Sequence, residues 1–238
     1  MAAHSSTGGV HINEVHHAHP YFPPDTVLAG FVPQQLPFEQ TLAVFFTATF
    51  LVLAFGWKLS GNYKHLATKE RLLVCWFLCT GLIHLIVEGA VVLNANFYKD
   101  TTRNILSEIW KEYAKADSRY ATRDDFVISM EAVTAFIEGP GCFLIVWALC
   151  ARKAWRYVAV VLVSLGQLYG DVLYFGTCIH GGVDRHTRPE FIYFWFYFVI
   201  INGIWIVIPF ACIVWAANRI NAAVAGEDSK AAAKKRKV

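Results

Sequence analysis

The sequence predicts an all-α integral membrane protein with five transmembrane helices. Of its 238 residues, 56% are hydrophobic and only 16% are charged, whereas an ordinary soluble domain carries about 25% charged residues. The apolar residues gather in five stretches without Lys or Arg, at 41–57, 72–93, 126–151, 157–179 and 191–218. A helix needs about 20 apolar residues to cross the hydrocarbon core, and unpaired backbone groups are costly in lipid, so each stretch is expected to be a helix.

The 21 Lys and Arg residues all lie outside these stretches and predict the orientation of the chain. Five crossings place 13 of them on one side of the membrane and 8 on the other. The positive-inside rule then puts the C-terminus in the cytosol and the N-terminus outside or in a lumen. We expect a flexible N-terminal arm over 1–36, the transmembrane domain over 37–220 and a basic cytosolic tail over 221–238. The five histidines of the arm do not predict a metal site, because no Cys or Glu spacing supports one.

Three further patterns concern packing. Segment 108–120 mixes aromatic and charged residues at helical spacing, which predicts a short helix that lies at the membrane interface and caps the bundle. The six cysteines lie in the apolar stretches or at their ends without a Cys-x-x-Cys pair, so we interpret them as small packing residues. Gly166 and Gly170 have the spacing that lets two helices approach closely, either inside the bundle or between the protomers of a homodimer.

Polar residues inside the apolar stretches are the candidate functional residues, because an ionisable group is expensive in a membrane. They are His84 and Glu88 in the second stretch, Glu131 and Glu138 in the third, Asp171 in the fourth and Asn202 in the fifth. Residues four or seven apart share a helix face. Counted from the non-cytosolic end, all six lie roughly 8 to 18 Å deep. They are therefore expected to converge in one cavity inside the bundle.

A buried His with several carboxylates suits general acid–base chemistry at neutral pH. The same set can instead form a proton or ion path, bind a cationic amine, or only join the helices by hydrogen bonds, the role we most readily give to Asp171 with Tyr174. Trp205 lies beside Asn202 near mid-membrane, where its indole is either a packed core residue or a group that stabilises a cation. The stretches contain no second His and the chain contains no phosphate loop, so no metal or cofactor is expected.

Five segments carry a resemblance to a known family. They are CWFLCTGLIHLIVEG (75–89), IWKEYAKADSRY (109–120), 130–134, GQLYGDVLYF (166–175) and YFWFYFVIINGIWIVIP (193–209). Over about 19–220 the chain resembles the emopamil-binding protein family, the sterol Δ8–Δ7 isomerases of the endoplasmic reticulum membrane. The resemblance implies catalytic roles for His84, Glu88, Glu131, Asn202 and Trp205. Within the matched segments we assign substrate binding to Tyr113, Asp117, Tyr120, Thr134 and Trp195. Glu138 departs from the pattern, since animal members have an aromatic residue there.

The resemblance also implies a mechanism without a redox cofactor or metal. An acid protonates C9 of a Δ8-sterol, the cation forms at C8, and a base removes a proton from C7. The His84–Glu88 pair and Glu131 are expected to share the acid and base roles, Asn202 to hold the protonation state of one of them, and Trp205 to face the cation. Cationic amphiphilic amines that mimic the cation are then expected to inhibit. The alternative is a non-enzymatic sterol- or amine-binding membrane receptor of the same fold.

Overall fold

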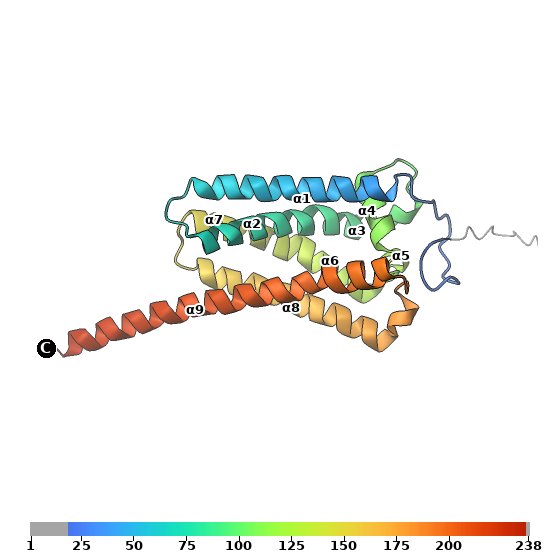
Figure 1. Ribbon diagram of the computed structural model, residues 1–238. Coiled ribbons are helices and arrows are strands. Elements are labelled where there is room, and N and C mark those ends of the chain that lie inside the picture. Colours follow the sequence, from blue (N-terminus) through green and yellow to red (C-terminus); the bar gives the residue numbers. More distant parts are fainter. Residues whose placement is uncertain (1–18, 237–238) are drawn as a thin grey trace, which may run out of the picture.

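Five long helices form the body of the protein in a computed structural model that describes residues 19–236 (Figure 1). The spans are α1 (Phe38–Gly61); α2 (Thr68–Leu82), η1 (Ile83–Glu88) and α3 (Gly89–Leu93); α6 (Asp125–Val133), η3 (Thr134–Glu138) and α7 (Gly139–Cys150); α8 (Arg156–Gly181); and η5 (Ile192–Ile201) with α9 (Asn202–Lys235). Each is long and apolar enough to cross a membrane. The predicted fold class is confirmed.

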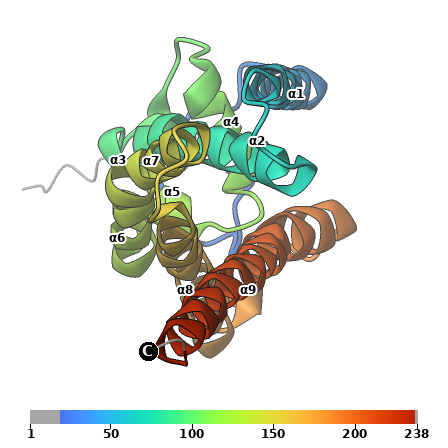
Figure 2. The same ribbon diagram turned by 90° about the vertical axis from the view of Figure 1, so that its left-hand side faces the viewer.

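The helices pack around two hydrophobic cores, one toward each end of the bundle. The core near the start of α6 includes Tyr120 and Tyr174, and the core near the opposite end includes Phe77 and Leu149. Glycine allows the close approach of α2 and α7, because a Cβ at Gly81 would lie 3.0 Å from the Cβ of Cys142. The view along the bundle shows α1 at its edge beside α2, away from α8 and α9 (Figure 2). The face of α1 that turns away from α2 is exposed and apolar, as expected for a helix in lipid.

Three spans depart from α-helical geometry beside the predicted polar residues. The π-helical segment η1 carries His84 and Glu88, η3 begins at Thr134, and η5 ends immediately before Asn202. A π-helical turn contains extra backbone, and such segments occur frequently at functional sites. The extra backbone changes which side chains face the interior, so helical spacing counted from the sequence is unreliable across these segments.

One end of the bundle is covered by short helices between the second and third spans, and we call it the capped end. The predicted interfacial helix over 108–120 is in fact two helices, α4 (Ile105–Tyr113) and α5 (Arg119–Thr122), preceded by η2 (Phe97–Lys99). Their charged side chains are buried in ion pairs. The nitrogen–oxygen distances are 3.0 Å for Lys111–Glu108, 2.5 Å for Lys115–Glu112 and 2.7 Å for Arg119–Asp117. These charged side chains are paired inside the protein, whereas the charged side chains of a simple amphipathic helix would face water.

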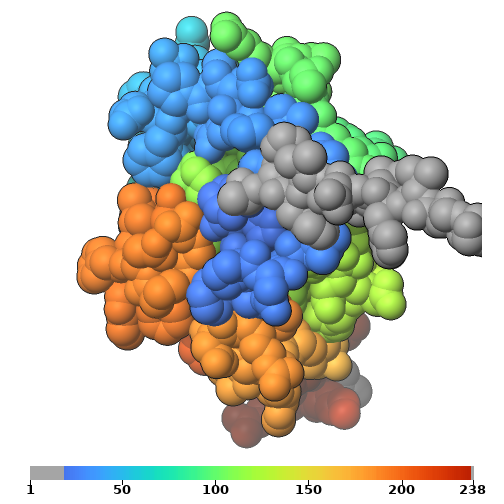
Figure 3. Space-filling model, turned by 90° about the vertical axis from the view of Figure 1, so that its right-hand side faces the viewer, coloured from blue at the N-terminus to red at the C-terminus, as the bar shows by residue number. Residues whose placement is uncertain are grey.

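Residues 19–36 cross the capped end as a packed strap (Figure 3). Tyr21 and Phe31 are buried in the core there, and Glu108 Oε2 accepts hydrogen bonds from the backbone nitrogens of Gln35 at 2.6 Å and Leu36 at 2.8 Å. This part of the predicted flexible arm is therefore a packed part of the fold. The predicted polar arm with His4, His11, His16 and His17 lies outside the described residues. The turn η4 (Val183–Arg185) lies between the fourth and fifth spans.

The last helix is longer than its apolar stretch. The sequence predicts a span that ends near residue 218, but α9 continues to Lys235 and projects beyond the bundle (Figure 1). Alanine has the highest helix propensity and is frequent in this extension. Glu227 and Lys230 also form an exposed ion pair one turn apart. The segment predicted as a basic tail is thus an exposed helix over most of its length.

The glycine pair of α8 packs inside the chain. A Cβ at Gly170 would touch Met130 at 3.7 Å, and a Cβ at Gly166 would overlap the carboxylate of Glu138. We expect Gly166→Ala to lower the free energy of unfolding by about 1–3 kcal/mol, the usual cost of overpacking. Thermal unfolding of the purified protein measures this loss. Gly176→Ala on the same helix is the matched control, because its Cβ would meet no atom within 4 Å. Equal stability of the two variants would contradict the packing described.

Candidate functional site

A cavity of about 460 Å³ lies inside the bundle and contains most of the predicted polar residues. All five spans and the two helices of the capped end contribute to its wall. The polar side chains among the lining residues are Thr41, Thr49, Thr80, His84, Glu88, Glu112, Tyr113, Tyr120, Glu131, Thr134, Gln167, Asp171, Tyr174, Tyr197 and Asn202. The other lining residues are mainly aliphatic or aromatic. An apolar cavity with a few convergent polar groups is typical of a small-molecule site.

His84 is held between two partners on different helices. Its Nδ1 lies 2.6 Å from Glu88 Oε2, and its Nε2 lies 3.0 Å from the amide nitrogen of Gln167. Gln167 Oε1 has no hydrogen-bond partner within residues 19–236. Turning the amide over would let Oε1 accept a hydrogen bond from Nε2–H of the imidazole. In either orientation, the imidazole plane is fixed by a carboxylate on one side and an amide on the other.

Two carboxylates from neighbouring helices converge on one hydroxyl group. Thr134 donates a hydrogen bond to Glu88 Oε2, and its Oγ1 lies 3.4 Å from Glu131 Oε2. The other oxygen of Glu131 accepts a hydrogen bond of 2.7 Å from the Tyr120 hydroxyl. Burial, with the nearby Glu131 carboxylate, raises the pKa of Tyr120, so the phenol stays protonated and remains a donor. Glu88, Glu131 and His84 thus form one connected hydrogen-bonding group.

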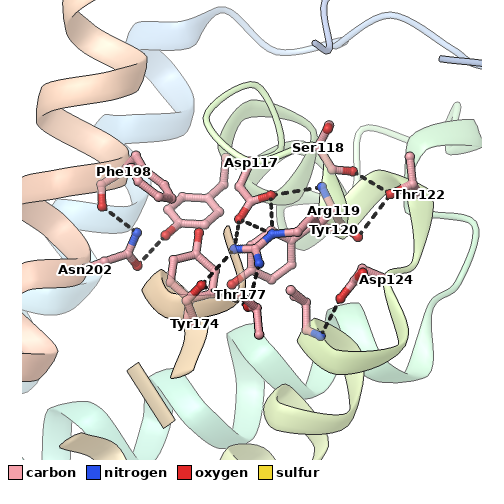
Figure 4. Close-up of polar contacts among 12 residues, drawn as sticks. Asp117, Ser118, Arg119, Tyr120, Thr122, Asp124, Tyr174, Thr177, Phe198 and Asn202 are labelled. Carbon is pink, nitrogen blue, oxygen red and sulfur yellow. Dashed lines mark hydrogen bonds and ion pairs between the residues drawn. The ribbon is translucent and has the colours of Figure 1, made fainter. Parts of the chain in front are cut away.

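Asn202 does not contact this group directly. Its Oδ1 accepts a hydrogen bond of 2.7 Å from the Tyr113 hydroxyl, and its Nδ2 donates to the backbone oxygen of Phe198 at 2.8 Å (Figure 4). The predicted hydrogen bond from Asn202 to His84 or a glutamate is therefore absent. The Asn202 side chain is instead occupied by the Tyr113 hydroxyl and by the backbone carbonyl group one helical turn before it. Asn202 instead joins the fifth span to α4.

Trp205 lies against the imidazole of His84. The two ring centroids are 4.9 Å apart, and a second indole, that of Trp76, lies 5.6 Å from Trp205. Both indoles line the cavity. An indole face in a desolvated site attracts a cation. The wall near His84 can therefore stabilise positive charge in a bound molecule.

Two buried carboxylates stand apart from the His84 group. Asp171 lines the cavity but its Oδ2 has no partner, and it forms no hydrogen bond with Tyr174, whose hydroxyl is also without a partner. The predicted structural pair of Asp171 with Tyr174 is therefore not formed. Glu138 is buried beside Gly166 and does not line the cavity. It is the one residue among the six predicted polar residues that lies outside the cavity wall.

The residues predicted to bind substrate divide into two sets. Tyr113, Tyr120 and Thr134 line the cavity. Asp117 and Trp195 do not. Asp117 is fully buried and pairs with Arg119, whose guanidinium also reaches Thr177 at 2.9 Å on α8 (Figure 4). Trp195 is 50% exposed on the outer side of η5, because the π-helical backbone turns this ring away from the interior.

Gln167, Glu112 and Tyr197 are among the lining residues that the sequence did not lead us to assign to the site. Gln167 lies four residues before Asp171, so the two share one face of the fourth span. Glu112 lies in the short α4, so no membrane depth could be counted for it. Among residues 19–236 no three His, Cys, Asp or Glu side chains come together as a metal-ligand group.

Comparison with known proteins places the chain in a family. Residues 105–216 match the family model described as EXPERA (EXPanded EBP superfamily). The chain is 39% identical over 215 residues to a probable 3-beta-hydroxysteroid-Delta(8),Delta(7)-isomerase of Oryza sativa, an alignment that covers 90% of this chain and 97% of the relative. This chain belongs to the emopamil-binding family.

Other members of the emopamil-binding family extend the range of relatives. A 3-beta-hydroxysteroid-Delta(8),Delta(7)-isomerase of Mus musculus is 40% identical over 215 residues, covering 89% of this chain and 93% of the relative. The isomeliandiol synthase of Melia azedarach is 36% identical over 181 residues, covering 76% of this chain and 84% of the relative. The family model covers α4, α5, the third and fourth spans and the membrane part of the fifth. His84 and Glu88 precede it, within the longer alignments to the isomerases.

Proposed function

We propose that this protein is a sterol isomerase that moves the Δ8 double bond of a 3β-hydroxysterol to Δ7. The main support for this proposal is that Glu88, Glu131 and His84 are linked by hydrogen bonds in the wall of an apolar cavity. The indole of Trp205 lies beside them. Relatives at about 40% identity bear the name of this activity. A rigid, mostly apolar substrate suits a cavity whose polar groups are few and clustered.

The reaction requires one proton to enter and one to leave. A protonated side chain gives its proton to C9, and the electron pair of the C8–C9 double bond forms the new C–H bond, which leaves a cation at C8. A base then removes a proton from C7, and the C7–H electron pair forms the C7–C8 double bond. The substrate and product have the same composition, so no electron donor or acceptor is consumed.

The His84–Glu88 pair and Glu131 are proposed to share the acid and base roles. Both carboxylates approach the Thr134 hydroxyl, which joins them in one hydrogen-bonding group. Tyr120 fixes the position of Glu131 through its 2.7 Å hydrogen bond. The connected group takes up the proton from C7, and proton exchange with solvent between turnovers returns it to its starting state.

Trp205 is proposed to face the cation at C8, and Asn202 to hold the wall in place. The Asn202 amide, joined to Tyr113, keeps the fifth span against α4 and so fixes the position of Trp205 three residues later. Catalysis then depends on stabilising a positively charged state. Cationic amphiphilic amines are proposed as inhibitors for the same reason, since their ammonium group would lie between the indole and the carboxylates.

We also propose that the protein lies in the endoplasmic reticulum membrane with its C-terminus in the cytosol and its N-terminus in the lumen. Lys and Arg are in excess on the side of the membrane that contains the α1–α2 loop, the α7–α8 loop and the end of α9, which supports this orientation. The capped end, with the strap of residues 19–36, would then face the lumen. The site residues remain near mid-membrane, where a sterol can enter from the lipid.

Turnover in deuterated water is expected to place one deuterium at C9 of the Δ7 product. The proton donated to C9 comes from a side chain that exchanges with solvent between turnovers, whereas the proton lost from C7 leaves the sterol. Mass spectrometry measures the gain of one deuterium, and nuclear magnetic resonance assigns its position. The control is the Δ7-sterol incubated with the same protein. A product without deuterium at C9 would contradict the mechanism, and tight amine binding without any product would favour a receptor.

A further inference from the structure

Six polar atoms of cavity-lining residues are buried and have no hydrogen-bond partner among the described residues. They are Trp76 Nε1, Glu112 Oε1, Gln167 Oε1, Asp171 Oδ2, Tyr174 Oη and Tyr197 Oη. Leaving a buried polar group unpaired is costly, and such groups in native structures usually have a partner. Unpaired atoms in a cavity wall therefore indicate where a ligand supplies polar groups of its own.

Glu112 and Tyr197 form a fixed pair at the capped end. They are only 2% and 3% exposed, and the ring of Tyr113, the residue after Glu112 in α4, packs against that of Tyr197. Lys115 binds Glu112 Oε2 at 2.5 Å and leaves Oε1 free. The Tyr197 ring is held between Tyr113 and Tyr193, with centroid distances of 6.1 Å to each. The carboxylate oxygen and the phenol are thus positioned before any ligand binds.

This pair is displaced along the cavity from the proposed reacting groups. Tyr197 precedes Trp205 by eight residues on the same span, about two helical turns nearer the capped end. Asp171 lies one helical turn from Gln167, which contacts His84, so Asp171 is nearer the level of the reaction. The wall that α1 contributes is mostly apolar and includes Phe45, Phe46 and Leu53. The Glu112–Tyr197 pair therefore lies at the capped end of the cavity, and the catalytic group lies farther from that end.

We propose that Glu112 and Tyr197 bind the 3β-hydroxyl group of the sterol. This inference rests on the proposed function. The hydroxyl group has one donor and two acceptor sites, so it can donate to Glu112 Oε1 and accept from the Tyr197 hydroxyl. It is separated from the Δ8 bond by the first two rings, and the hydrocarbon tail leaves the opposite end of the ring system. With ring A at the capped end, the tail extends away from that end, past the His84 group and along the apolar side chains of the cavity wall.

The test compares Tyr197→Phe with the unchanged protein on two Δ8-sterols, one with the 3β-hydroxyl and one without it. For the hydroxylated sterol, we expect Tyr197→Phe to lower kcat/KM by about tenfold, the effect of one lost hydrogen bond. For the 3-deoxy sterol, the variant should match the unchanged protein within about twofold. Tyr169→Phe is the matched control, because Tyr169 is exposed on α8 and does not line the cavity.

The unchanged protein gives an independent measurement that needs no variant. It should convert the hydroxylated sterol with a kcat/KM at least about tenfold above that of the 3-deoxy sterol, and the 3-methyl ether should also be poor because it cannot donate to Glu112. Equal kcat/KM for all three sterols would overturn the hydroxyl site and leave the isomerase proposal intact. Equal losses on both sterols in Tyr197→Phe would also overturn it. Conversion of none of the sterols would overturn the proposed function itself.

Discussion

Replacing Glu131 with Gln is expected to lower kcat for a Δ8-sterol by about a thousandfold, within the range for loss of a general acid or base. The substitution keeps the size of the side chain and its carbonyl oxygen, so Tyr120 can still donate its hydrogen bond. It removes only the ability to carry a proton. Turnover is measured by chromatography of the Δ7 product formed by purified protein in lipid nanodiscs.

Two variants of the same helix separate chemistry from folding. Asp125→Asn removes an exposed acid from the first turn of α6 and should retain full activity. Glu131→Asp keeps the acid but withdraws it from Thr134 and Tyr120, so its activity should lie between those of Glu131→Gln and the unchanged protein. Full activity of Glu131→Gln would remove Glu131 from the proton transfers. Equal activity of the Asp and Gln variants would mean that position, rather than the proton, decides the rate.

The membrane spans and the depth of the polar residues could be predicted because both follow from simple physical limits. The hydrocarbon thickness sets the length of each span, and the cost of burying charge makes every intramembrane acid stand out. Counting residues from the shared membrane surface then placed His84, Glu88, Glu131 and Asn202 at similar depth. All four line one cavity.

The facing of individual side chains could not be predicted in the same way. Counting assumes a constant number of residues per turn, but three spans contain π-helical segments next to the site. The matched segments led us to place Trp195 at the substrate, although the ring lies on the outer surface, and the resemblance joined Asn202 to the catalytic group, although it contacts Tyr113. No pattern of residue types in this chain predicts which turns adopt π-helical geometry.

The capped end shows why the environment of a segment cannot be predicted from its own residues alone. Segment 108–120 has the charges of an interfacial helix, but several of its charged residues are buried by a strap that lies about 75 residues earlier in the chain. Glu108, for instance, binds the strap backbone and Lys111 together. Because of this long-range pairing, a segment with the composition of a surface helix covers one end of the cavity. Glu112 was missed as a lining residue for this reason.

Replacing Trp205 with Leu is expected to lower kcat by about thirtyfold. A desolvated indole face contributes about 2 kcal/mol to a cation, and about 1.4 kcal/mol corresponds to a factor of ten in rate. The Trp205 ring lies 4.9 Å from that of His84, so it faces the same part of the cavity as the proposed proton donors and acceptors. Leucine keeps the wall apolar but cannot attract charge. Trp147→Leu, an exposed tryptophan on α7, is the control and should retain full activity.

Binding measurements distinguish the charge effect from a loss of shape. The Leu variant should bind a protonated amphiphilic amine about thirtyfold more weakly, whereas its affinity for a neutral sterol analogue of similar outline should change only a few-fold. Trp205→Phe, which retains an aromatic face, should lie between the two in both turnover and amine affinity. If the neutral analogue loses as much affinity as the amine, Trp205 acts by filling space, and the cation at C8 must be stabilised by the carboxylates of Glu88 and Glu131 alone.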